Sequence, residues 1–393
     1  MKFMQIARMA VITALSLTFA AACAGPGAPT PKAEQAPPAA PVPVMKAEIA
    51  PADKAADLPI STEIGTAVTD GEVESVTLVD AQGQGVAGRM RADRTSWVPD
   101  EPLKFSQTYT ATVLAKGADR SQTLTTTFTT MREAGNRGGT GLYLQDGEEY
   151  GVAMPVVVEF TSDVEPEARA GVEKRLFVTT SPEQPGVWHW TGPRQVTYRA
   201  REYWQPGTTI SVRAALDGQP FGGGRYGDTD RRATVKIAAS PVELFIDNAT
   251  KHLTVKENGT ATRSMPVSLG KASTPSSSGV MVIMDKKTRT VFDTTGEPGD
   301  QYRADVSYAQ RLTWGGEFIH AAPWSVGDQG VNNVSHGCVN MSWGDAQWLF
   351  SVTHIGDPVT VTGTEQALVN GNGFTAWNLS WEEYVKGSAL PGR

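Results

Sequence analysis

Residues able to perform nucleophilic chemistry gather in one short stretch toward the C-terminal end of the chain. The stretch contains two of the five histidines, His320 and His336, and one of only two cysteines, Cys338. A thiol is a weak nucleophile at its free pKa, and a neighbouring imidazole can take its proton and hold the thiolate as an ion pair. Gly337 permits a tight turn and leaves backbone N–H groups uncovered beside the thiol, which suits stabilisation of an oxyanion. Residue types and spacing alone therefore predict a cysteine acyltransferase or hydrolase.

The composition of the chain excludes several kinds of site and partner. A single free cysteine is often a small buried hydrophobe, but an exported protein rarely keeps an unpaired thiol without a reason. Two cysteines far apart exclude a disulfide scaffold and a four-cysteine metal cluster. The formal net charge of -7 argues against nucleic acid as a partner. We expect no metal and no cofactor.

The N-terminal residues have the pattern of a targeting segment. Lys2 and Arg8 precede an apolar run, and small residues then lead to Cys23. This pattern resembles the lipobox of bacterial lipoproteins, although Ala20 stands where leucine is usual, and ordinary signal cleavage is the alternative. We expect a signal peptide over 1–22, and a lipidated Cys23 with a Pro/Ala-rich spacer over 23–45. The protein would then be exported and anchored by lipid at the outer face of the cytoplasmic membrane, in the cell-wall space.

The rest of the chain predicts a mainly β protein of several domains. Short strand-like runs separated by turn residues indicate two tandem immunoglobulin-like β-sandwiches, over 46–134 and 135–240. The first contains a stretch around Tyr109 that resembles a tyrosine corner, and the stretch after Tyr203 has a similar layout. The aromatic residues of the second domain are expected in its core or at an interface rather than in a sugar-stacking platform: Trp188, Trp190, Tyr203 and Trp204. Its acidic loop, 217–230, matches no calcium loop.

A β-rich catalytic domain is expected over 241–364. Strands at 242–247 and 252–257 lead into an Asn258-Gly259 hairpin turn, and runs at 280–284 and 290–292 suggest another pair. A short helix should begin after Ser342, and 359–361 should be a last strand. A C-terminal extension, 365–393, is expected to pack its aromatic side chains back onto a domain.

One motif in this domain resembles a known family. The catalytic domains of the peptidoglycan L,D-transpeptidases (the YkuD type) carry a histidine followed, after a gap, by Ser/Thr-His-Gly-Cys-hydrophobic-Asn. This chain has His320, followed by Ser335-His336-Gly337-Cys338-Val339-Asn340. The layout of a lipoprotein signal, two immunoglobulin-like domains, this domain and a Trp-containing tail is similar to that of the large actinobacterial members.

The resemblance implies a role for each matching residue. Cys338 would be the nucleophile and His320 the general base, oriented by a backbone carbonyl, for which Ala321 is the candidate. His336 would support the pocket and the oxyanion site, to which Gly337 and Cys338 would contribute their backbone N–H groups. Seven further residues would bind the substrate or shape its loop: Tyr302, Gly315, Gly316, Trp324, Asn333, Ser335 and Asn340. The segment from 292 to 302, a flap in the family, is shorter here than in the large members.

The implied reaction forms 3→3 cross-links between peptidoglycan stems through a cysteine thioester, with release of terminal D-Ala. A tetrapeptide stem would be the acyl donor, the side chain of a diamino acid the acceptor, and carbapenem β-lactams would be inhibitors. Two alternatives remain open at this point. The same chemistry could deliver the acyl group to water, as in an L,D-carboxypeptidase, or the chain could be a non-enzymatic wall-binding lipoprotein.

Overall fold

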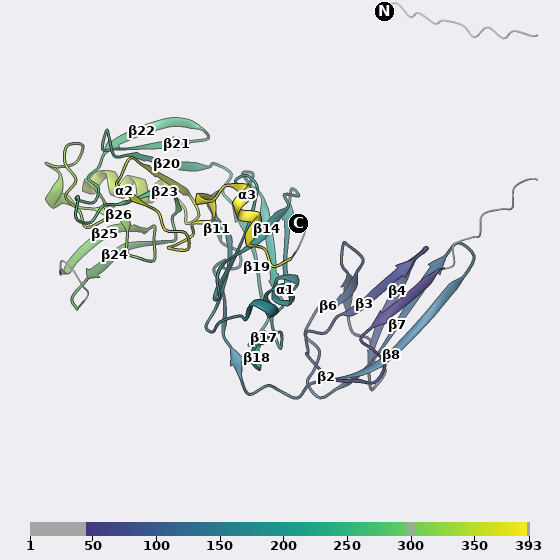
Figure 1. The fold of residues 1–393 in the computed structure, drawn as a ribbon. Helices are drawn as coiled ribbons and strands as arrows, with labels where there is room; N and C mark the ends of the chain where they lie inside the picture. The colour runs from purple at the N-terminus through teal and green to yellow at the C-terminus, as the bar shows by residue number, and fades with distance from the viewer. Residues whose placement is uncertain (1–44, 297–300, 302, 391–393) are drawn as a thin grey trace, which may run out of the picture. The chain divides into compact units, whose positions relative to one another are not determined.

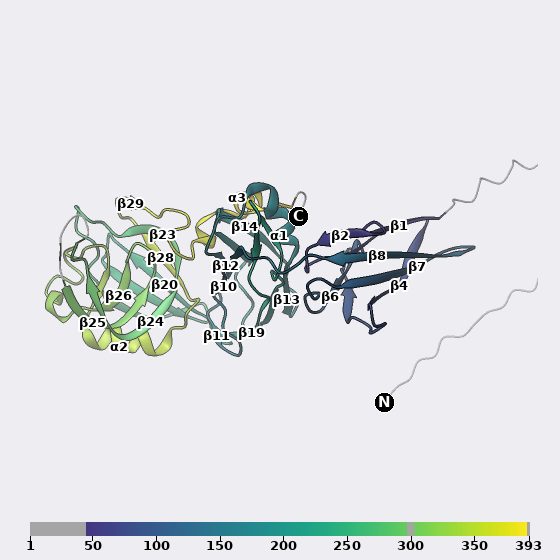
Figure 2. The ribbon, with the colours of Figure 1, turned by 90° about the horizontal axis from the view of Figure 1, so that it is seen from below.

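The computed structural model describes residues 45–296, 301 and 303–390. The signal peptide, Cys23 and most of the spacer lie outside these residues, as does Tyr302. The described residues form a series of β-sheets with little helix, and the predicted fold class is confirmed (Figures 1 and 2). Within the described part of the chain, no helix is long and apolar enough to cross a membrane.

The first immunoglobulin-like domain consists of two four-stranded sheets. One contains β1 (Lys46–Ala50), β3 (Ile64–Thr69), β6 (Ser96–Pro99) and β5 (Gly88–Met90), and the other contains β2 (Ala55–Leu58), β8 (Ser121–Thr130), β7 (Thr108–Gly117) and β4 (Gly71–Asp80). Most of β7 alternates buried and partly exposed residues, as expected for a strand with one face on a core. The Tyr109 hydroxyl accepts a hydrogen bond from the Lys104 N–H at 2.9 Å, which is the bond of a tyrosine corner.

The second domain repeats this plan with one helix added. One sheet contains β10 (Thr140–Leu142), β12 (Val156–Phe160), β15 (Gln195–Ala200) and β14 (Gly186–Gly192), and the other contains β11 (Glu149–Tyr150), β19 (Arg231–Ile237), β16 (Thr209–Ala214) and β13 (Leu176–Ser181). Three short strands and α1 (Pro166–Lys174) lie beside them: β17 (Pro220–Gly222), β18 (Arg225–Gly227) and β9 (Arg137–Gly138). Its corner-type bond is made by Tyr150, which accepts from the Gln145 N–H at 2.9 Å, rather than near Tyr203.

The aromatic residues of this domain are structural. Trp188, Trp190 and Trp204 are buried in its core, and the indole of Trp204 donates to the Met154 carbonyl at 2.7 Å. Such rings contribute to stability through the large apolar area that they bury. They are not available as a sugar-stacking platform.

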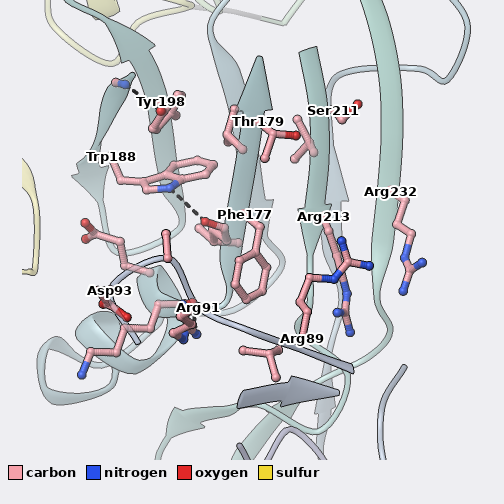
Figure 3. A pocket seen from close by; sticks show the side chains of 18 of the residues that line it. Arg89, Arg91, Asp93, Phe177, Thr179, Trp188, Tyr198, Ser211, Arg213 and Arg232 are labelled. Carbon is pink, nitrogen blue, oxygen red and sulfur yellow. Dashed lines mark hydrogen bonds between the residues drawn. The ribbon is translucent and has the colours of Figure 1, made fainter. Parts of the chain in front are cut away.

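Glu63 of the first domain is the centre of an ion-pair cluster with the second. Its carboxylate accepts hydrogen bonds from Arg91 and, at 2.8 Å, from Arg175. The guanidinium of Arg91 lies 4.9 Å and that of Arg213 5.9 Å from the centre of the Phe177 ring. Figure 3 shows Arg91, Phe177 and Arg213 around one pocket of about 650 Å³. Burial alone would raise the pKa of Glu63, but the hydrogen bonds from Arg91, Ser96 and Arg175 outweigh it and lower the pKa to about 2.

We predict that Glu63→Gln destabilises the first domain in a pH-dependent way. A carboxyl whose pKa falls from 4.5 to about 2 on folding contributes stability that is present above pH 4.5 and lost as the pH falls toward 2. The contribution at pH 7 is about 3 kcal/mol. Scanning calorimetry should therefore show a lower melting temperature for the variant at pH 7, and the difference should narrow below pH 4.5. The control is Glu72→Gln at an exposed ion pair, which should change little. A difference that is the same at all pH values would contradict this assignment.

Among the residues that the structure describes, the third domain contains two sheets, one α-helix and a short 3-10 helix, Pro323–Ser325. The larger sheet has the order β22 (Thr260–Pro266), β21 (His252–Glu257), β20 (Val242–Asp247), β28 (Pro358–Thr362), β23 (Ser277–Val282) and β29 (Gln366–Ala367). The smaller sheet has the order β24 (Asp285–Asp293), β25 (Arg303–Arg311), β26 (Phe318–Ala321) and β27 (Val339–Met341). As predicted, Asn258 and Gly259 form the hairpin turn, both at positive φ, and Ser342 caps α2 (Trp343–Val352) by accepting from the Asp345 N–H.

One predicted strand pair is wrong. The runs 280–284 and 290–292 do not pair with each other: β23 pairs with β28, and β24 pairs with β25. The intervening residues, 285–289, contain no glycine, proline or asparagine to form a tight turn. The chain therefore continues in extended conformation from one sheet into the other.

The C-terminal extension packs on the second immunoglobulin-like domain, as its aromatic residues suggested. The hydroxyl of Tyr384 donates to the Thr197 carbonyl at 2.8 Å, and its ring stacks on His189. The guanidinium of Arg199 lies 4.5 Å from the centre of the Trp377 ring and 4.3 Å from that of Tyr384. Figures 1 and 2 both show α3 (Trp381–Tyr384) beside β14.

Candidate active site

Parallel pairing of β26 with β27 brings the two parts of the motif together. Ile319, His320 and Ala321 stand opposite Val339, Asn340 and Met341. Side chains two residues apart along a strand lie on the same face, so Cys338, directly before β27, is directed to the side of Asn340 and His320. The pairing of these two strands therefore brings the segments that carry His320 and Cys338 together, although they are separated in the sequence.

Cys338 lies in a buried pocket of backbone groups. Its side chain is almost fully buried, and its thiol lies 3.7 Å from the Gly316 carbonyl oxygen. Burial raises the pKa of this thiol to about 12, although a backbone hydrogen bond from Phe318 acts in the opposite direction. The free enzyme therefore holds a neutral thiol.

His320 is buried on β26 and is also neutral. Burial lowers the pKa of its imidazole to about 4, because the charged form is poorly solvated there. Its Nδ1 lies 2.9 Å from the Ala321 carbonyl oxygen, the carbonyl that the motif suggested. Because only a protonated Nδ1 can bond to a carbonyl, Nε2 carries the free lone pair. A neutral imidazole with a free Nε2 is able to accept a proton from a thiol.

The turn before Cys338 is held by hydroxyl groups. Ser335 Oγ donates to the Cys338 carbonyl at 2.6 Å and accepts from the Gly337 N–H at 3.2 Å. Gly337 has a φ of +115°, which a residue with a side chain rarely adopts. In this structure the Gly337 N–H is bonded to Ser335, and its role at an oxyanion stays a prediction.

The other predicted residues divide into two groups. Asn333, Ser335 and Asn340 bond within the protein: Asn333 Oδ1 accepts from the Leu269 N–H at 3.2 Å, and Asn340 Nδ2 donates to Ser325 Oγ at 3.1 Å. Their side chains therefore position the turn. Trp324 is 61% exposed, and Gly315 and Gly316 lie in the turn beside the thiol, so all three remain accessible to a substrate.

His336 is exposed, with Nε2 3.2 Å from Lys271 Nζ, and so it lies at the rim rather than beneath the thiol.

Sequence reasoning missed three residues of the site. Ser276 Oγ donates to the Gly337 carbonyl at 2.7 Å and accepts from the Gly270 N–H at 3.0 Å. Because Ser276 directly precedes β23, these bonds hold the turn at Gly337 against the start of that strand. The ring of Phe292 lies edge-on to the His320 ring with 5.2 Å between ring centres. Glu317, between Gly316 and β26, places a carboxyl near Gly337. Serine, phenylalanine and glutamate at these distances along the chain carry no local pattern that would have indicated them.

The chain matches two protein families and several known proteins. A family described as the L,D-transpeptidase catalytic domain matches residues 241–361, and a bacterial Ig domain family matches residues 55–220. The L,D-transpeptidase 2 of Mycobacterium tuberculosis (strain CDC 1551 / Oshkosh) is 34% identical over 397 residues, which cover 97% of this chain and 96% of that protein. The chain belongs to the L,D-transpeptidase family. The chain is also 34% identical to L,D-transpeptidase 5 of M. tuberculosis (strain ATCC 25618 / H37Rv), over 98% of this chain and 86% of that one.

A solved structure covers part of the same region. The structure of LD transpeptidase LdtMt1 in complex with imipenem aligns with 57% of this L,D-transpeptidase and 99% of that chain, at 32% identity and a TM-score of 0.48. The family membership rests on the full-length relatives. It makes the catalytic domain that of an acyltransferase-type enzyme.

Proposed function

We propose that this L,D-transpeptidase forms 3→3 cross-links between peptidoglycan stems through a thioester on Cys338. The observation that carries the proposal is a buried Cys338 thiol directly before β27 and a buried, neutral His320 on β26, the strand that pairs with β27, in a domain of this family. Family membership supports the substrate class, and the burial and neutral state of the two groups support the roles that we propose for them. No cofactor is required for the reaction.

The first step transfers the donor stem to the enzyme. Nε2 of His320 takes the thiol proton as Sγ of Cys338 attacks the carbonyl carbon of the third residue of a tetrapeptide stem. The tetrahedral intermediate collapses, its bond to the terminal D-Ala nitrogen breaks, and the imidazolium gives its proton to that leaving amine. Because both groups start neutral, charge develops only once the substrate is in place.

The oxyanion of this intermediate needs a hydrogen-bond donor near Sγ. The Gly337 N–H is bonded to Ser335, whereas no hydrogen bond to the Cys338 N–H is found among the described residues. The backbone amide of Cys338 itself is therefore the candidate donor. Ser276 and Ser335 support it by fixing the carbonyls on either side of that amide.

The second step forms the cross-link. A side-chain amine of a diamino acid on a neighbouring stem attacks the thioester carbonyl and loses a proton to His320. The carbon–sulfur bond then breaks, and the imidazolium returns the proton to Sγ, so that the free enzyme is restored. The new amide joins the third residues of the two stems.

The test of this function is incubation of the purified chain with a defined disaccharide-tetrapeptide, followed by chromatography and mass spectrometry. We expect free D-Ala and dimers cross-linked between third residues. Tripeptide monomers without dimers would replace the proposal by an L,D-carboxypeptidase. No change in the substrate would leave only a wall-binding role.

We also propose that the protein is exported and held by lipid on Cys23 at the outer face of the cytoplasmic membrane. The support is the sequence of the first 23 residues, with small residues directly before the cysteine. Cys23→Ala is expected to move the protein from the membrane fraction to the soluble fraction of the cell envelope. Unchanged fractionation would contradict lipidation.

A further inference from the structure

Glu317 occupies a position next to the nucleophile. It follows Gly316, whose carbonyl oxygen lies 3.7 Å from the thiol of Cys338, and it precedes the strand that carries His320. Its N–H donates to Thr313 Oγ1 at 3.0 Å, which closes the turn between β25 and β26. The carboxyl is thereby directed from a fixed backbone.

The two carboxyl oxygens have different environments. Oε1 accepts a hydrogen bond from the Ser277 N–H at 2.7 Å. Oε2 is fully buried and has no hydrogen-bond partner among the residues that the structure describes. A buried carboxylate oxygen without a donor is costly, whereas a protonated one is tolerated more easily.

The carboxyl also lies against the catalytic turn. A Cβ atom built on Gly337 would be 3.7 Å from Glu317 Cγ and 3.9 Å from Oε1. Gly337 directly precedes Cys338, so a charge on Glu317 acts on the sulfur through low-dielectric surroundings. Burial raises the pKa of Glu317, and a charged Glu317 adds to the effect of burial in raising the pKa of Cys338.

The other charged groups near this pair are few. His320 lies on β26, and the causes that lower its pKa do not include Glu317. Lys271 and His336 contact each other at the exposed rim. The guanidinium of Arg311 is directed to the carbonyls of Thr313 and Trp314. Ser277 on β23 donates to the carboxyl from its backbone N–H, and hydrogen bonding by the side chains of Ser277 and Thr313 also acts to lower the pKa of Glu317.

We propose that Glu317 is a positioning residue that sets the pH range in which Cys338 can form a thiolate. In its neutral form the carboxyl keeps its hydrogen bond with Ser277 and exerts no like-charge repulsion on the developing thiolate. In its ionised form it opposes the thiolate by like-charge repulsion. The two acids therefore titrate as a coupled pair. This inference rests on the proposed function only in taking Cys338 as the nucleophile.

The experiment measures alkylation of Cys338 by iodoacetamide against pH in the full chain, which needs no peptidoglycan substrate. Glu317→Gln keeps an oxygen for the Ser277 N–H and removes the charge. We expect its alkylation midpoint to move down by about one pH unit, so that alkylation is roughly tenfold faster below both midpoints. Glu317→Asp, which keeps the charge, should stay near the wild-type midpoint.

Two further variants make the result decisive. Glu317→Ala removes the charge without an isosteric replacement and should shift the midpoint in the same direction, so it serves if Glu317→Gln does not fold. Glu257→Gln, at the hairpin between β21 and β22, is the matched control and should leave the midpoint unchanged. An unchanged or raised midpoint in a folded neutral variant of Glu317 would overturn the proposal. Failure of the cross-linking assay with the midpoint shifted would instead count against the proposed function alone.

Discussion

Cys338→Ala is expected to abolish acyl transfer, with a loss on the order of 10⁴-fold or more in the rate of D-Ala release from a tetrapeptide stem. The reason is that the variant has no atom able to form the thioester, and no second cysteine exists among the described residues to replace it. The substitution removes one small buried atom, so the melting temperature should change by only a few degrees. Release of D-Ala is measured by coupled assay, and a folded Cys338→Ala protein that still forms dimers would exclude the mechanism.

His320→Ala is expected to slow acylation of Cys338 by about 10²- to 10⁴-fold at neutral pH. Because the pKa of the thiol is raised to about 12 and that of the imidazole is lowered to about 4, the pair is neutral at pH 7 and the thiol depends on His320 to accept its proton. Without the imidazole, the thiolate must come from solution hydroxide. The rate in the variant should therefore rise steadily with pH toward 12, whereas wild type should be much less dependent on pH.

A carbapenem is a suitable probe for this prediction, since its strained carbonyl can be attacked by the thiolate in place of the donor stem. Intact-protein mass spectrometry should show one adduct per wild-type chain and slow formation of the same adduct in His320→Ala. The matched control is His252→Ala, because His252 lies on β21 and its Nδ1 contacts its neighbour Thr250. Equal adduct rates in wild type and His320→Ala would show that His320 is not the base.

The sequence predicted the parts of this protein whose information is local. The Asn258-Gly259 turn and the Ser342 cap depend on residues adjacent in the chain, and both occur where expected. Cys338 and His320 could be singled out from the sequence because both belong to one short motif. The pairing partner of 280–284 was wrong, because strand partners depend on contacts far along the chain that alternation alone does not define.

The residues that refine the site could not be predicted for the same reason. Ser276 and Glu317 reach the catalytic turn from two different strand ends, and only the folded sheet brings them to Gly337. The prediction for the Gly337 N–H did not take into account the side chain of Ser335, whose Oγ accepts a hydrogen bond from this N–H. Ser335 stands two residues before Gly337, so a local side-chain-to-backbone bond was a signal that could have been used.

The central claim is that Cys338 carries the stem as a thioester between donor and acceptor. The most direct measurement is rapid acid quenching of wild-type enzyme with a tetrapeptide donor in the absence of acceptor, followed by intact mass and peptide mapping. We expect an adduct of the tripeptide acyl unit on the peptide that contains Cys338, and this adduct should disappear when a diamino-acid acceptor is added and dimer forms. Dimer formation at full rate with Cys338 never modified at any quench time would contradict it.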